Sequence, residues 1–84
     1  MDVMDALDGN AIGGLLHEVF GTEMTGAPSV CGHCGDARPV AELAVYVQAP
    51  GTVVRCRTCE DVLMIFVQVR GRTCVDLQGL AALG

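Results

Sequence analysis

Apolar positions near the start of the chain repeat at helical spacing. Between residues 10 and 20 they fall within about half of a helical wheel, with glycine, histidine and glutamate opposite. These apolar residues are Ala11, Ile12, Leu15, Leu16, Val19 and Phe20. Asp8 or Asn10 can accept hydrogen bonds from the first free N–H groups, and Gly21 suits a left-handed helix end. The pattern predicts an amphipathic helix over residues 10–20.

Two adjacent glycines weaken this predicted helix. Gly13 and Gly14 each cost about 1 kcal/mol relative to alanine, so the helix needs tertiary contacts to persist. We therefore expect its apolar face to dock, either as a lid on a sheet of the same chain or against a partner or a second copy.

After a linker predicted over residues 22–30, the chain changes to short β-branched segments separated by turn residues. Such spacing is typical of antiparallel strands. Residues 42–48 are the first strand candidate, and period-two alternation places Leu43, Val45 and Val47 on one face.

Further strands follow at short intervals. Residues 49–52 are expected to form a turn, and residues 53–55 to lead back toward a cysteine pair. Residues 62–70 predict a longer strand that is apolar on both faces, so both faces should be covered. Gly71-Arg72 fits a two-residue hairpin loop that joins this strand to another over residues 73–77.

Two CxxC pairs, Cys31 with Cys34 and Cys56 with Cys59, indicate a metal-binding site. A CxxC turn directs two sulfur atoms toward one point, and two such knuckles that face each other complete a tetrahedron. Gly32 and Gly35 suit the tight first knuckle, whereas the second contains no glycine. The spacing predicts one metal ion held by Cys31, Cys34, Cys56 and Cys59.

The length of the chain favours a stabilising metal site, and its net charge limits the classes of partner that it could bind. A chain of 84 residues is one small domain whose core alone gives marginal stability, so we expect a metal ion to stabilise the fold. Ten acidic residues against five arginines give a net charge of −5, which argues against nucleic acid and anionic membranes as partners.

The sequence also bears on location. It has no basic leader and no apolar run long enough to span a bilayer, so we expect a cytoplasmic protein with no membrane contact. Thiols stay reduced in that compartment, and clustered cysteines there indicate a metal site before disulfides.

The paired knuckles resemble a zinc ribbon over residues 29–77. The whole chain, including the segment Asp-Ala-Leu-Asp-Gly-Asn at residues 5–10, is similar to a family of short uncharacterised bacterial proteins that carries a domain-of-unknown-function label. These resemblances imply a small zinc-stabilised β fold, a zinc ribbon of three or four antiparallel strands with one N-terminal α-helix. The helix and linker would occupy residues 1–28. The remaining residues 78–84 would form a tail, either a helical turn or a frayed end.

The expected cofactor is one structural Zn²⁺. Iron is the competing metal, because the same four thiolates support a rubredoxin-like centre. The chain has one tyrosine, two phenylalanines and no tryptophan, so the aromatic surroundings of such an electron-transfer site are thin and zinc is favoured.

Several single residues carry weaker expectations. Cys74, inside the last predicted strand, is expected to be a small buried hydrophobe. His33 should be exposed between two ligands, and His17 should be solvated on the polar face of the helix. Arg38, Arg55 and Arg57 lie near the knuckles and should offset the negative charge of the thiolates.

These features predict a non-enzymatic structural-zinc protein that acts as a small protein-binding or adaptor module. It would contact a protein partner, or self-associate, through its N-terminal helix. One alternative is a nucleic-acid-binding zinc ribbon with a basic strip formed by Arg55, Arg57, Arg70 and Arg72. The other is a thiol-redox-responsive protein that releases its metal on oxidation, with Cys74 taking part.

Overall fold

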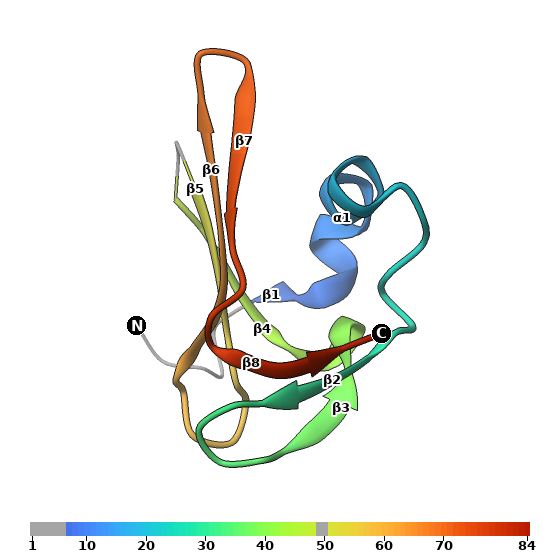
Figure 1. The fold of residues 1–84 in the computed structure, drawn as a ribbon, viewed down its shortest axis with the longest axis vertical. Coiled ribbons are helices and arrows are strands. Elements are labelled where there is room, and N and C mark those ends of the chain that lie inside the picture. Colours follow the sequence, from blue (N-terminus) through green and yellow to red (C-terminus); the bar gives the residue numbers. More distant parts are fainter. Residues whose placement is uncertain (1–6, 49–50) are drawn as a thin grey trace.

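Two antiparallel sheets and one N-terminal helix make up the fold (Figure 1). The structure, a computed structural model, describes residues 7–48 and 51–84. The helical elements are η2 (Gly9–Ile12), α1 (Gly13–Phe20) and η3 (Val40–Glu42). The strands are β1 (Leu7–Asp8), β2 (Pro28–Cys31), β3 (Ala37–Pro39), β4 (Ala44–Gln48), β5 (Gly51–Arg55), β6 (Val62–Val69), β7 (Arg72–Asp76) and β8 (Leu80–Leu83).

The larger sheet has the strand order β1-β4-β5-β6-β7. Its last hairpin corrects the predicted loop by one residue. Val69 pairs with Arg72, so the loop is Arg70-Gly71 and not Gly71-Arg72. Both loop residues have positive φ, 53° and 77°, as in a type I′ turn. This turn is favoured in two-residue hairpins because its backbone twist matches the twist of the flanking strands. The strand expected over residues 73–77 is shifted by the same residue.

The smaller sheet, β3-β2-β8, was not expected from the sequence. Strand β2 begins at Pro28, within the linker predicted over residues 22–30, and the predicted tail forms β8. Ser29 of β2 pairs with Leu83, and the N–H of Gly84 donates to the carbonyl of Pro28 at 2.9 Å. The fold therefore contains a five-stranded and a three-stranded sheet in place of one sheet of three or four strands.

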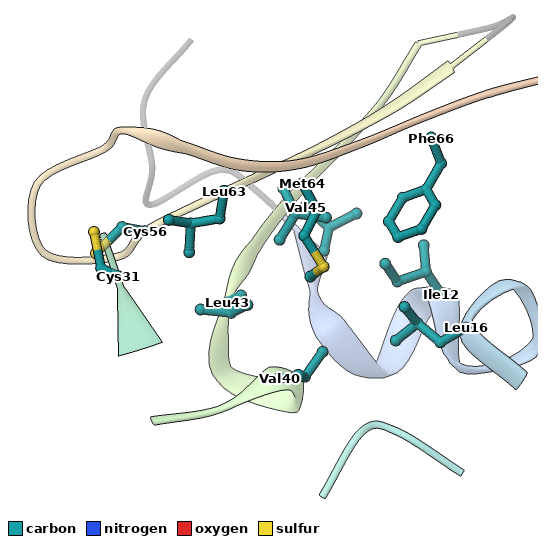
Figure 2. Packing of buried hydrophobic residues seen from close by; sticks show 11 residues of the cluster. Ile12, Leu16, Cys31, Val40, Leu43, Val45, Cys56, Leu63, Met64 and Phe66 are labelled. Atoms are coloured by element: carbon teal, nitrogen blue, oxygen red, sulfur yellow. The ribbon is translucent and has the colours of Figure 1, made fainter. Parts of the chain in front are cut away.

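The predicted helix is confirmed, with a 3₁₀ first turn before α1. Asp8 accepts a hydrogen bond from the N–H of Asn10 at 3.1 Å, and Gly21 ends the helix at φ 74°. Leu16 is 1% exposed and packs with Ile12 toward Phe66 of the larger sheet (Figure 2). The helix is thus a lid within its own chain. None of the helices in the described residues is long and apolar enough to cross a bilayer.

Burial follows the predicted face of the strand only in part, and β4 begins after Leu43. Leu43 and Val45 are buried, but Val47 is 57% exposed. Ala44 and Tyr46, which point to the other face, are buried as well. The turn expected over residues 49–52 falls partly outside the described residues, and its second half, residues 51–52, belongs to β5.

Strand β6 supplies much of the core, but only one of its faces is fully covered. Leu63, Met64 and Phe66 are buried, whereas Ile65 and Val67 are half-buried. A register shift between β5 and β6 beside the cysteine end turns Leu63 toward the same cluster as Met64. Figure 2 places two cysteines, Cys31 and Cys56, at one end of this core.

Candidate metal centre

The first knuckle begins where β2 ends. The N–H groups of His33 and Cys34 point at the Sγ atom of Cys31, at 3.3 and 3.4 Å. Gly35 takes φ 79° and donates its N–H to the carbonyl of Cys31 at 3.0 Å. The N–H of Cys31 donates to the carbonyl of Asp36 at 2.9 Å, which closes the turn.

The second knuckle, between β5 and β6, repeats this geometry. Thr58 donates its N–H to the Sγ atom of Cys56 at 3.4 Å, and Glu60 donates to the carbonyl of Cys56 at 3.0 Å. The N–H of Cys56 donates to the carbonyl of Asp61 at 2.9 Å. Glu60 occupies the position of Gly35 and adopts φ 64°, so a non-glycine residue accepts the left-handed conformation here.

The two knuckles bring the four predicted ligands together. The Sγ atoms of Cys31, Cys34, Cys56 and Cys59 all lie within 4.8 Å of one another. Cys31 approaches Cys59 at 3.6 Å, and Cys34 approaches Cys56 at the same distance. Cys31 and Cys56 are buried, while Cys34 is exposed. The cluster is therefore anchored in the core on one side and open to solvent on the other, and it can hold a metal ion.

The close approach of the four sulfur atoms shifts the pKa values of the Cys31 and Cys59 thiols in opposite directions. Burial raises the pKa of Cys31, but the N–H groups of Cys34 and His33 and the neighbouring thiols lower it to about 7. For Cys59, the N–H of Asp61 lowers the pKa, yet burial and the three other sulfurs raise it to about 12. Four thiolates cannot coexist at this spacing without a cation, because each negative sulfur disfavours the next.

A polar contact links the knuckles outside the sulfur cluster. Asp36 accepts hydrogen bonds from the hydroxyl of Thr58 at 2.8 Å and from Nε of Arg38 at 2.7 Å. These two donors, in that order, lower the pKa of the Asp36 carboxyl. Asp36 and Thr58 were not among the predicted site residues, and their only signal in the sequence is their place beside or inside the CxxC turns.

The arginines of the expected basic strip lie in two separate places, Arg55 and Arg57 at the second knuckle and Arg70 and Arg72 at the opposite end of β6. Arg55 donates to the carbonyl of Glu60 at 3.0 Å, within the second knuckle. Arg57 donates to the carbonyl of Glu42 at 3.0 Å. Arg55 pairs with Val62 at one end of β6, and Arg72 pairs with Val69 at the other. These two ends are about 23 Å apart along the strand. The four arginines of the expected basic strip therefore do not form one strip.

Three single-residue expectations have mixed outcomes. His33 and His17 are exposed, as expected. Cys74 is also exposed, so the expectation that it is a buried hydrophobe is wrong. The reason is its position on β7, a strand at the end of the sheet order whose five residues are all exposed.

A groove of about 550 Å³ lies between the helix and the larger sheet. Ile12 and Leu15 line one wall, Val47 and Phe66 line the other, and Glu18 stands at the rim. Its lining is mainly apolar, which is the usual character of a contact site for another molecule.

Comparison with known protein families identifies the family of this chain. The model of a family of unknown function, DUF6510, matches residues 3–84 of the chain. No curated protein and no solved structure matches it.

Proposed function

Since the chain belongs to the DUF6510 family, whose function is unknown, we propose a function from the site itself. One structural zinc ion holds the fold, the protein is not an enzyme, and it acts as a small protein-binding or adaptor module. The observation that carries this proposal is the cluster formed by Cys31, Cys34, Cys56 and Cys59.

The sulfur spacing fits zinc. Four sulfur atoms in a tetrahedron about 2.3 Å from Zn²⁺ lie about 3.8 Å from one another. The two closest pairs, Cys31 with Cys59 and Cys34 with Cys56, are both 3.6 Å apart. Backbone N–H groups aimed at Cys31 and Cys56 further stabilise thiolates, as outer-shell hydrogen bonds do in such sites.

Zinc in this position would connect the two sheets. Cys31 is the last residue of β2 in the smaller sheet, and Cys56 directly follows β5 in the larger one. A tetrathiolate ion leaves no coordination position for water or substrate, which supports a structural role over hydrolysis.

The groove beside the helix supports the binding role. Val47 is 57% exposed at its wall, although it is a large apolar side chain in a strand. Glu18 at the rim and the net charge of −5 favour a partner whose apolar side chain is flanked by basic residues. We take that partner to be a protein segment, since the residues that line the groove include no lysine or arginine to bind a phosphate.

Metal analysis tests the first part. Protein purified without chelator should contain one zinc per chain. Red iron colour, or half an equivalent of zinc or less in well-folded protein, would contradict the proposal.

Cysteine substitutions test where the metal binds. Cys34→Ser and Cys59→Ser should each abolish the cooperative thermal transition, because structural zinc supplies folding free energy directly. Cys74→Ser should leave both zinc content and transition unchanged, since Cys74 lies outside the cluster. Equal damage from all three would show that the ligands are misassigned.

A groove variant tests the binding role. Zinc-loaded protein immobilised at its C-terminus should capture a defined partner protein from the source cell, and Val47→Asp should abolish that capture. Val69→Asp is the matched control, because Val69 is a similarly exposed strand valine, 49% exposed, that does not line the groove. Equal capture by both variants would remove the groove from the proposal. Tight, salt-sensitive binding of nucleic acid would favour the alternative function.

A further inference from the structure

Strand β7 leaves one edge of the larger sheet open. It stands last in the sheet order, pairs with β6 without a register shift, and has no second strand partner among the described residues. All five of its residues are exposed. Proteins usually blunt such an edge with charged side chains, proline, a bulge or a covering segment. In β7 only the end residues, Arg72 and Asp76, are of a blunting type.

Hairpin geometry determines which backbone groups face outward. A two-residue loop closes on a hydrogen-bonded pair, here Val69 with Arg72. Bonded and non-bonded pairs alternate along an antiparallel ladder, so Cys74 also bonds to β6. Thr73 and Val75 then direct their N–H and C=O groups away from β6, to the open edge.

The sequence Arg72-Thr73-Cys74-Val75-Asp76 is complementary to its own reverse. We propose that β7 pairs antiparallel with β7 of a second copy of this chain, centred on Cys74, so that the two larger sheets become continuous. In that register Arg72 stands opposite Asp76 of the second copy, and the second copy's Arg72 stands opposite Asp76. The outward groups of Thr73 meet those of Val75 in hydrogen-bonded pairs at both positions.

The charges of Arg72 and Asp76 favour a second copy of β7 as the partner strand, in the antiparallel register centred on Cys74. A parallel arrangement in register would place Arg72 beside the second copy's Arg72, and Asp76 beside its Asp76. A shifted antiparallel register would separate the opposite charges. Opposite charges directly across a strand pair stabilise it, and like charges destabilise it. Because only five residues pair, the interface is small, and we expect weak, concentration-dependent dimers.

The central position supplies a probe. Cys74 meets the second copy's Cys74 at a non-hydrogen-bonded site, where Cα atoms are about 4.5 Å apart. A short bismaleimide can therefore join the two thiols and trap the dimer. The cluster cysteines are engaged by metal in the loaded protein, and Cys74→Ser gives the matched control.

Sedimentation of the metal-loaded full chain tests the charge pairing. The dimer fraction should rise with concentration, and Arg72→Asp should raise the dimer dissociation constant about tenfold, because two attractive pairs become repulsive. Combining Arg72→Asp with Asp76→Arg should restore association. Arg70→Asp is the control, since Arg70 lies in the hairpin loop outside the paired strand. A monomer at every concentration, or a dimer that survives Arg72→Asp, would overturn the proposal, as would a dimer with no cross-link through Cys74.

Discussion

At the scale of single residues, the left-handed turn of the second knuckle stands out. Glu60 adopts φ 64°, where the first knuckle has Gly35 at φ 79°. A non-glycine residue in this conformation destabilises the folded state by roughly 1–2 kcal/mol. A glycine removes that strain, but part of the gain is lost because glycine also raises the conformational entropy of the unfolded chain. Glu60→Gly should therefore raise the free energy of unfolding of the metal-loaded protein by about 0.5–1 kcal/mol. Denaturant titration measures it.

The first knuckle provides the opposite experiment. Gly35→Ala places a Cβ in the same conformation, and no atom lies within 4 Å of that Cβ, so only backbone strain is added. The free energy of unfolding of this variant should be about 1 kcal/mol lower than that of the original protein. A loss of stability in Glu60→Gly would show that the Glu60 side chain contributes more than its backbone costs.

At the scale of elements, the helix depends on one side chain. Leu16 of α1 is 1% exposed against the larger sheet, so Leu16→Ala should cost about 2–5 kcal/mol of stability. Glu18→Ala, on the exposed side of α1, should stay within about 0.5 kcal/mol of the original protein. Thermal melting of both variants checks this, and similar midpoints would contradict a docked helix.

Elements held by local patterns could be predicted. The helix over residues 10–20, the long strand β6 and the clustering of the four cysteines follow from periodicity, β-branched runs and CxxC spacing. The smaller sheet could not, because Pro28 begins β2 and a Leu-Ala-Ala-Leu segment forms β8. Neither has the composition of a strand, and each exists through pairing with a distant segment.

Exposure was harder to predict than secondary structure. Period-two alternation gives the face of a strand but not its place in the sheet, so the exposure of Cys74 on the end strand and of Val47 in β4 was not predicted. The hairpin loop was displaced because Gly71 fits either two-residue loop, and only the pairing of Val69 with Arg72 fixes the register.

At the scale of the whole molecule, the tail supports the metal centre. The carbonyl of Gly79 accepts the N–H of Gly32, in the first knuckle, at 2.8 Å. A Cβ on Gly79 would lie 1.9 Å from the carbonyl oxygen of Val62, so the tail crosses β6 in close contact. Truncation after Leu77 should therefore lower the melting midpoint and accelerate zinc loss to a chelator, about tenfold. Unchanged zinc retention would show that the knuckle needs no support from β8.

The pairing of β2 with β8 also sets an order of events in time. Each knuckle lies in a local hairpin, the first between β2 and β3 and the second between β5 and β6, whereas β2 and β8 join segments from opposite parts of the sequence. Short-range pairings fold sooner, because less chain entropy is lost in closing them. We therefore expect a single knuckle to capture the ion first, with two thiolates, before the two sheets come together and the other knuckle completes the coordination. Rapid mixing with Co²⁺ would separate the two steps by thiolate absorption, and a single step would show that both knuckles close together.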